Sequence, residues 1–438
     1  MDQDSLASAI VESPPTATQS SLAERYVRIR AFSDTLCETL EPEDCCIQSM
    51  PDVSPTRWHL AHTTWFFETF VLSQFPGYEA KNNQYAYLFN SYYNAIGEQF
   101  PRARRGLLSR PSMRDVRGYR RAIDAAMIDL LEQLEAELPQ SVASIVELGL
   151  NHEQQHQELM LTDIKHVFSC NPLFPVYRDG ELTISTSPHK LGWDAFDAGV
   201  YWIGHAGQGF AYDNETPSHR VFLEPFELGT RLISCAEYLE FMLDNGYQRP
   251  DLWLSEGWRR VCEEGWRAPL YWHEREGDWH EFTLAGLRPL SLQLPACHVS
   301  YFEADAFARW FGARLPTEAE WEIASQQTPL DGNAADQLVS AGRAVHPSAA
   351  TRSADQRAIL QMFGDAWQWT SSSYAAYPGY QPASGALGEY NGKFMCNQYV
   401  LRGGSCATPS GHVRRTYRNF FPADARWQFS GIRLARSA

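Results

Sequence analysis

The chain has 438 residues, of which 44% are hydrophobic and 21% charged, a composition typical of soluble globular proteins rather than of disordered, collagen-like or coiled-coil chains. At about 150 residues per domain, this length predicts two or three domains. Asp and Glu number 53 against 37 Lys and Arg, giving a net charge of −16, which argues against nucleic acid or an anionic membrane as a partner. No apolar run approaches the roughly 18 residues that a membrane span needs, and the acidic N-terminus lacks the features of a secretory signal. We therefore expect a cytoplasmic protein.

The nine cysteines are scattered along the chain and form no CxxC pair. The sequence therefore indicates neither a zinc ribbon nor a thioredoxin-type site. In the cytoplasm such residues stay reduced, and we expect most of them in the core.

The first 20 residues are rich in Ser, Thr and Pro and predict a disordered tail. A helix is then expected from Ser21, which forms a capping-box pattern with Glu24. A second helix is expected from Ser54, a cap residue followed by Pro55 at the first helical position.

Two longer helices are predicted at about 112–138 and 142–168, each with apolar residues at helical spacing. Four amphipathic helices in this part of the chain predict an antiparallel bundle over residues 21–170.

A connection of unusual length, about 77–111, joins the second and third predicted helices. Loops this long in a compact domain are usually functional or disordered. This one is too aromatic for disorder, so we interpret it as a site loop. Its aromatic residues are Tyr85, Tyr87, Phe89, Tyr92, Tyr93 and Phe100.

The composition and hydrophobic pattern of the sequence change after a linker at 171–190. Twelve of the 14 tryptophans lie beyond Pro172, and short apolar runs alternate with Gly, Pro and Asn turns. Only one clear helix is predicted there, at 300–311. Residues 191–438 are therefore expected to form an irregular α+β domain.

Three histidines carry the sharpest chemical signal. His152 and His156 are four residues apart on the apolar stripe of one predicted helix, so their imidazoles lie one above the other. His62 lies on the apolar face of another predicted helix. His59 precedes it by three residues, and we expect His59 either behind the metal ligands or at the surface. Buried, hydrogen-bonded histidines are the competing interpretation. The spacing favours a metal site inside the bundle, where such sites are built from facing helices.

The segment His152-Glu-Gln-Gln-His156 also matches the H-E-x-x-H pattern of zinc metallopeptidases, in which the glutamate is the general base. The extended form of that pattern is absent, because Leu159 and Thr162 stand where Gly and His are required. A peptidase therefore stays a remote alternative.

Several stretches resemble the ergothioneine-biosynthesis sulfoxide synthases, the EgtB family. In the first part of the chain these are SPTRWHLAHTTWFFETF at 54–70, NSYY at 90–93, the segment 102–111, and LGLNHEQQHQELMLTDIKHVF at 148–168. In the second part they are GFAYDNETPSH at 209–219, GARLPTEAEWE at 312–322, GDAWQW at 364–369 and RGGS at 402–405. The resemblance spans about residues 22–435.

The resemblance implies an α+β fold, in which a DinB-like four-helix bundle precedes a domain of the formylglycine-generating-enzyme type, related to C-type lectins. It also implies a mononuclear non-heme Fe(II) centre held by His62, His152 and His156. Such an enzyme uses O2 as co-substrate to join a thiol to C2 of the imidazole of hercynine and to oxidise the sulfur to a sulfoxide. Three neutral imidazoles on one face of an octahedron leave three positions open, which suits this chemistry.

Five further residues take roles from the resemblance. Tyr93 in the NSYY loop matches the catalytic tyrosine of the cysteine-using branch, a proton donor to the oxygen that is reduced, and Tyr92 is expected to support it. Arg102 and Arg105 match the arginines that hold the carboxylate of the sulfur donor, for which the guanidinium fork is suited. Gln155 matches the residue expected to hydrogen-bond the substrate imidazole.

The segment 417–421 resembles the hercynine-binding region of the family. Asn419, Phe420 and Phe421 are expected to contact hercynine, because aromatic faces attract a trimethylammonium group.

Several alternatives remain open. The same scaffold also serves enzymes that take γ-glutamylcysteine, or a selenosugar, as donor, and the NSYY loop with Arg102 and Arg105 favours cysteine. A formylglycine-generating activity, as that family implies, requires a cysteine pair after the 402–405 turn, and only Cys406 is present. A role as a binding module alone leaves the histidines unexplained. The oligomeric state is not indicated.

Overall fold

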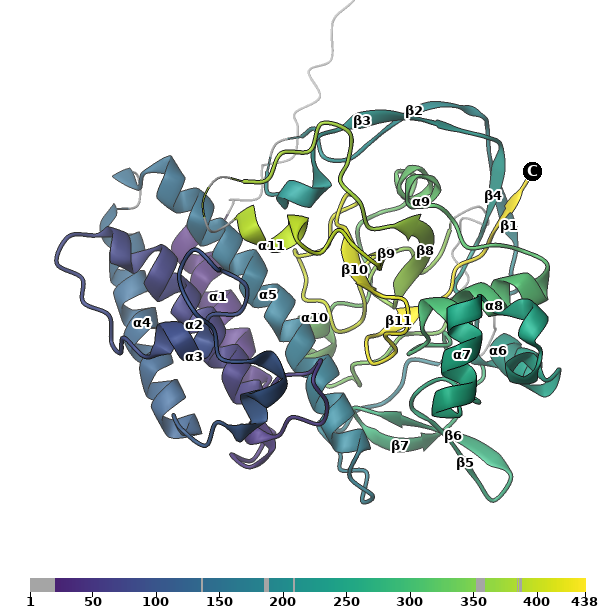
Figure 1. Ribbon diagram of the computed structural model, residues 1–438, viewed down its shortest axis with the longest axis horizontal. Helices are drawn as coiled ribbons and strands as arrows, with labels where there is room; N and C mark the ends of the chain where they lie inside the picture. Colours follow the sequence, from purple (N-terminus) through teal and green to yellow (C-terminus); the bar gives the residue numbers. More distant parts are fainter. Residues whose placement is uncertain are drawn as a thin grey trace, which may run out of the picture.

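The computed structural model describes residues 20–438 except for 135–136, 185–188, 208, 352–358, 384 and 386–387. The predicted tail therefore lies outside the described residues, apart from Ser20. The molecule consists of a helical bundle beside a sheet-rich domain (Figure 1), so the expected α+β class and its order are confirmed. No helix in the described ranges combines the length and hydropathy needed to cross a membrane.

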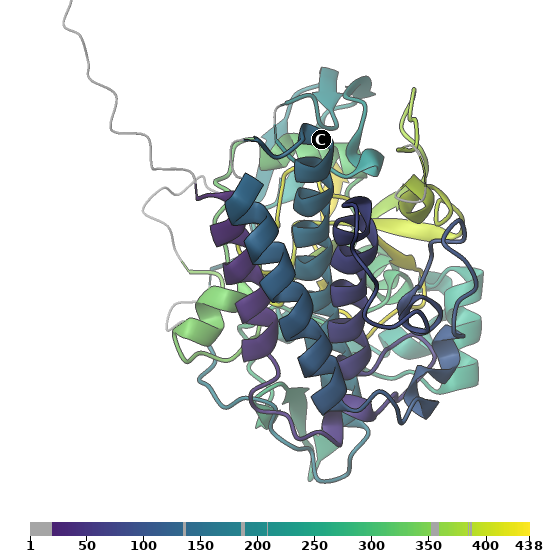
Figure 2. The same ribbon diagram turned by 90° about the vertical axis from the view of Figure 1, so that its left-hand side faces the viewer.

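Four long helices form the bundle and lie side by side, with the second domain behind them (Figure 2). They are α1 (Leu22–Thr35), α2 (Thr56–Phe70), α4 (Met113–Leu134) and α5 (Gln140–Ser169). Their connections hold η1 (Asp44–Cys46), η2 (Leu72–Gln74), α3 (Tyr85–Phe89) and η3 (Arg102–Leu107).

The capping box predicted at Ser21 and Glu24 is present. The second helix begins one residue later than predicted, at Thr56, with Pro55 in place of Ser54 as its N-cap. The reason is that the polar groups of Ser54 serve tertiary contacts: its N–H donates to Asp163 at 2.8 Å and its hydroxyl accepts from Arg105 at 2.9 Å.

The second domain contains four small sheets, ordered β1-β4-β12, β10-β9-β8-β11, β2-β3 and β5-β6-β7. Within them, only the pairing of β11 with β8 is parallel. The strands are β1 (Trp193–Phe196), β2 (Gly199–Ile203), β3 (His219–Leu223), β4 (Phe226–Gly229), β5 (Trp272–Arg275), β6 (Asp278–Thr283), β7 (Gly286–Pro289), β8 (Trp367–Ser373), β9 (Gln398–Arg402), β10 (Asn419–Pro422), β11 (Ser430–Gly431) and β12 (Ala435–Ser437).

The expectation of a single clear helix in this domain is wrong. Besides α8 (Tyr301–Phe311), the structure contains α6 (Cys235–Leu243), α7 (Ser255–Glu264), α9 (Glu318–Ser325), α10 (Ala335–Ser340) and α11 (Glu389–Gly392). These helices are too short to display several turns of periodicity. Capping boxes mark two of them, with N-caps Ser234 and Thr317.

Helix α5 runs along the border between the bundle and the second domain (Figure 1). Its Glu158 is buried and accepts hydrogen bonds from the Trp367 indole at 2.7 Å, the Ser405 hydroxyl at 2.5 Å and the Thr408 hydroxyl at 2.7 Å. The turn that presents Ser405 needs glycine at 403, where φ is +103° and a Cβ would lie 2.6 Å from a backbone oxygen. These contacts fix α5 against the second domain.

A buried ionic cluster joins α5 to α1 and α4. The Glu153 carboxylate accepts from Arg30 at 2.7 Å, from Arg120 at 2.8 Å and from the Ser33 hydroxyl at 2.5 Å. Burial alone would raise the pKa of Glu153, but the two guanidinium groups and the hydroxyl hold that pKa at about 2. Glu153 therefore stays ionised and stabilises the bundle.

We predict that Glu153→Gln lowers the free energy of unfolding by about 3–5 kcal/mol, because Arg30 and Arg120 both lose their fully buried counter-ion and keep only the more exposed Asp124 and Asp34. In the wild-type protein, the contribution of Glu153 to the free energy of unfolding should be complete above pH 4.5. It should decline as pH falls toward about 2, since the pKa of Glu153 is depressed in the folded state. Urea unfolding followed by circular dichroism measures both effects. Glu147→Gln, which removes a partly exposed ion pair with Arg25, is the control and should cost under about 1 kcal/mol. Equal losses in the two variants would contradict this account.

Candidate metal centre and substrate pocket

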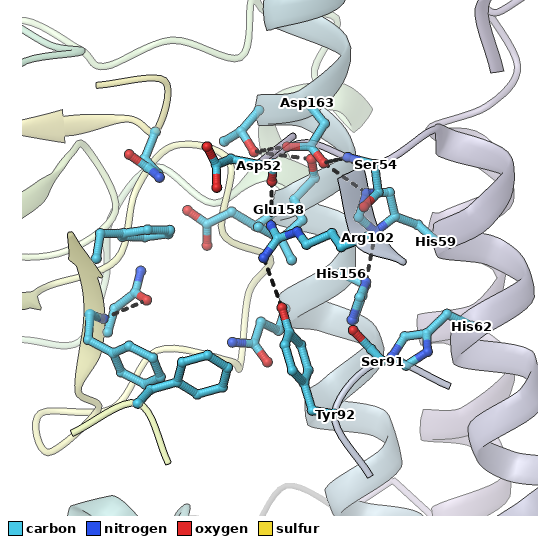
Figure 3. Close-up of a pocket in the computed structure, with 18 of the residues that line it drawn as sticks. Asp52, Ser54, His59, His62, Ser91, Tyr92, Arg102, His156, Glu158 and Asp163 are labelled. Atoms are coloured by element: carbon cyan, nitrogen blue, oxygen red, sulfur yellow. Dashed lines mark hydrogen bonds and ion pairs between the residues drawn. The ribbon is translucent and has the colours of Figure 1, made fainter. Parts of the chain in front are cut away.

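A cavity of about 290 Å³ lies between the bundle and the second domain (Figure 3). The bundle contributes side chains from α2, α5 and the long predicted site loop, and the second domain contributes β10 and its neighbours. All the residues expected to hold the metal or to contact the substrates line this one cavity, although they come from distant parts of the chain. They are His62, Tyr92, Tyr93, Arg102, Arg105, His152, Gln155, His156, Asn419, Phe420 and Phe421.

Helices α2 and α5 bring the three histidines together. One ring nitrogen from each of His62, His152 and His156 lies within 4.8 Å of the others, and Nε2 of His62 is 3.1 Å from Nε2 of His152. All three side chains are buried. Burial and the neighbouring imidazoles lower the pKa of His62 and His156 well below the usual value, and burial lowers the pKa of His152 to about 4. Three neutral imidazoles with converging nitrogens fit a divalent metal ion.

The outer nitrogens of two of these rings are bonded. His62 Nδ1 donates to the carbonyl oxygen of Phe89 at 2.5 Å, which leaves Nε2 free of a proton and facing the site. His156 Nδ1 lies 2.8 Å from Nδ1 of His59, whose Nε2 is 3.0 Å from Asp163. His59 therefore lies directly behind a candidate ligand, one of the two positions expected for it.

Glu153 takes no part in the cavity wall, because its carboxylate points toward Arg30 and Arg120. A metallopeptidase needs this glutamate beside the metal as general base. The structure therefore opposes the peptidase interpretation of the H-E-x-x-H segment. Cys406 is fully buried, and burial raises the pKa of its thiol well above the usual value, so it also lacks the character of a reactive cysteine.

Arg105 is a buried cation beside the histidines. Its guanidinium donates to the hydroxyls of Ser54 and Ser91, each at 2.9 Å, and stacks 3.3 Å from the centroid of the Trp58 ring. Within the described ranges it makes no ion pair, and its Nε has no hydrogen-bond partner. Burial lowers the pKa of Arg105. A guanidinium held in this way fits an anionic ligand group.

Arg102 lies nearer the solvent and donates to the Tyr92 hydroxyl at 2.8 Å, as Figure 3 shows. Tyr93 is buried, with its ring packed 4.9 Å from that of Phe70 and 6.1 Å from that of Trp65. The two tyrosines therefore differ in their surroundings: Tyr92 contacts the cation of Arg102, whereas Tyr93 packs among aromatic side chains of the bundle.

The second domain supplies the opposite wall. Phe420 on β10 stacks on Tyr374, with ring centroids 4.0 Å apart, and Phe421 packs against Trp427 at 5.9 Å. Sequence reasoning missed several wall residues, among them Ser54, Asp163, Trp367, Phe394 and Gln398. Ser54, Asp163 and Trp367 fall inside the quoted family motifs, whereas Phe394 and Gln398 carry no comparable signal.

Comparison with known proteins agrees with this architecture. Residues 25–160 match the DinB superfamily, and residues 197–438 match the sulfatase-modifying factor enzyme 1-like domain. The chain is 31% identical to the hercynine oxygenase of Mycolicibacterium smegmatis over 94% of its own length and 96% of that protein. It is 30% identical to the hercynine oxygenase of Mycobacterium tuberculosis, over 94% and 98% of the two chains. It is 28% identical to ergothioneine biosynthesis protein 1 of Schizosaccharomyces pombe, over 52% and 28%.

The hercynine oxygenase relatives show that the protein is an oxidoreductase. Its DinB-type bundle supplies the three-histidine site, and its sulfatase-modifying-factor domain supplies the facing wall. The chain belongs to the hercynine oxygenase family.

We predict that His152→Ala loses high-affinity binding of a divalent metal, because one of three converging imidazoles is removed. Anaerobic titration of the purified protein with Fe(II) or Co(II), with metal content determined after gel filtration, measures the loss. His280→Ala, which lies outside the cavity wall, is the control and should retain one metal per chain. Undiminished binding in His152→Ala would show that the metal lies elsewhere.

Proposed function

We propose that this protein is a non-heme Fe(II)- and O2-dependent sulfoxide synthase of ergothioneine biosynthesis. In this proposal it joins the sulfur of cysteine to C2 of the hercynine imidazole and produces hercynylcysteine sulfoxide. The observation that carries the proposal is the juxtaposition, in one cavity, of three converging neutral imidazoles, a buried guanidinium held by two neutral hydroxyls, and the aromatic side chains of β10. When bound, Fe(II) supplies open coordination positions at which a thiolate, an imidazole and O2 meet.

Arg105 is proposed to bind the carboxylate of the sulfur donor. The two serines that hold its guanidinium are neutral, so its charge is available to a ligand. Arg102 extends the same cationic wall toward the solvent. A carboxylate that accepts from such a fork is oriented as well as bound.

The size of the cavity favours cysteine over γ-glutamylcysteine as donor. Its volume of about 290 Å³ is at the lower end of the roughly 300–1,000 Å³ of small-molecule sites. Hercynine and a donor must share this space.

Tyr93 is proposed as the proton donor, with Tyr92 in support. Tyr93 lines the cavity and is held by aromatic neighbours in the bundle, so its hydroxyl has a fixed position. Tyr92 is oriented by Arg102. Exclusion of water by this packing keeps proton transfer confined to placed groups.

The second domain is proposed to bind hercynine. The faces of Phe420 and Phe421 suit its trimethylammonium group, which cannot donate a hydrogen bond. Asn419 on the same strand and Gln155 on α5 supply polar contacts for the carboxylate and the imidazole.

The direct test is anaerobic loading with Fe(II), followed by O2, hercynine and one donor, with products identified by mass spectrometry. We expect a hercynine–cysteine sulfoxide adduct with cysteine, and less or none with γ-glutamylcysteine or a selenosugar. Tyr93→Phe should lower the rate or shift the product toward cysteine sulfinate, whereas Tyr87→Phe, a partly exposed tyrosine of the same loop, should not. If none of the donors gives an adduct with hercynine, the proposal is refuted.

We predict that Arg105→Ala raises KM for cysteine roughly 30-fold, corresponding to about 2 kcal/mol for a lost charged hydrogen bond. KM for hercynine should change much less, because none of its proposed contacts (Gln155, Asn419, Phe420 and Phe421) involves Arg105. Steady-state oxygen uptake at varied concentrations of each substrate measures both values. Arg104→Ala removes an exposed arginine of the same η3 segment and is the matched control. Equal effects on the two substrates would contradict the assignment.

A further inference from the structure

We propose that His59 and Asp163 are positioning residues of the metal centre. Through a buried chain of hydrogen bonds they set the tautomer of His156 and strengthen its hold on the metal. The inference rests on the metal-binding role proposed above and assigns a function to two residues outside the ligand set.

The hydrogen bonds from Asp163 through His59 to His156 form a continuous series that is shielded from solvent. Asp163 Oδ2 is 3.0 Å from His59 Nε2, and His59 Nδ1 is 2.8 Å from His156 Nδ1. All three side chains are buried. The carboxylate is itself anchored, since the Ser54 N–H donates to the same Oδ2 at 2.8 Å, and Thr162 Oγ1 lies 3.3 Å from Oδ1.

The direction of the protons follows from chemistry. A carboxylate only accepts, so a neutral His59 donates its Nε2–H to Asp163, and its Nδ1 is left as an acceptor. His156 must then carry its proton on Nδ1 and donate it to His59. This leaves Nε2 of His156 with a lone pair, the form in which an imidazole binds a metal. The opposite direction would place a proton on the metal-binding nitrogen.

The three candidate ligands therefore have unequal support. His62 is held by the neutral carbonyl of Phe89. His152 Nδ1 is buried without a hydrogen-bond partner in the described part of the chain. Only His156 is connected to a negative charge. A carboxylate hydrogen-bonded behind a metal ligand raises the basicity of that ligand. The hydrogen bonds through His59 to Asp163 should therefore make His156 the strongest metal ligand of the three histidines.

Asp163→Asn removes the negative charge of this side chain while keeping the hydrogen bonds that it accepts. Ser54 and His59 both donate to one oxygen of Asp163, so the amide oxygen of Asp163→Asn can accept from both. His59→Leu removes the chain, and His59→Gln retains an amide that can accept from His156. Controls from the same bundle are Asp124→Asn, whose carboxylate serves Arg30 and Tyr26, and His166→Gln, whose ring bonds Ser49.

The experiment is anaerobic titration of each full-length variant with Co(II), together with thermal unfolding of the metal-free protein. We expect the Kd for Co(II) to rise about 10-fold in Asp163→Asn and up to about 100-fold in His59→Leu, with His59→Gln between wild type and His59→Leu. The two controls should keep the wild-type Kd whatever their stability. Proton NMR of the Co(II) protein gives a second readout: the shifted Nδ1–H signal of His156 should exchange with water faster in His59→Leu.

The outcomes are separable. An unchanged Kd in Asp163→Asn and His59→Gln, with an unchanged Nδ1–H signal in a folded His59→Leu protein, would overturn the inference and leave the metal centre intact. If His59→Leu fails to fold, the nearly isosteric Asp163→Asn variant decides by its Kd alone. Failure of the wild-type protein to bind Co(II) or Fe(II) would instead remove the metal centre itself, and this inference with it.

Discussion

The structure depends on one demanding constraint, the burial of a polar helix. Helix α5 lies between the two domains and carries ionisable side chains at Glu153, Glu158, Asp163 and Lys165, all of them buried. A buried charge is tolerated only where partners surround it. The rest of the fold supplies those partners, and this requirement fixes the two domains around the helix.

The partners of these α5 side chains come from the other bundle helices and from the second domain. Glu153 is paired by α1 and α4, and Glu158 is bonded by the second domain. Asp163 is reached from α2 through His59, and the Lys165 amine lies 2.6 Å from Nε2 of His298 in the second domain. Because these contacts orient the helix, one of its faces is left to the cavity, and that face presents the two histidines. The ionic framework and the candidate metal centre are therefore parts of one arrangement.

The sequence predicted the helices of the bundle and the candidate ligands because their signals are local. Two histidines four residues apart on an apolar stripe indicate a shared face before any packing is known. The orientation of Glu153 was beyond local reasoning, since the H-E-x-x-H spacing is the same whether its carboxylate faces a metal or two arginines. Likewise, His59 stands three residues from His62, yet its partners are 97 and 104 residues away. The short helices of the second domain were missed because an eight-residue helix such as α9 spans little more than two turns.

The central claim is that metal and substrates meet in this interdomain cavity. It is tested most directly by a crystal structure of the Fe(II)-loaded protein with hercynine and cysteine, determined without oxygen and with anomalous data at the iron edge. We expect one anomalous peak bonded to His62, His152 and His156, with the cysteine carboxylate on Arg105 and the trimethylammonium group against Phe420 and Phe421. An iron peak at another place, or one bonded by Glu153, would contradict it.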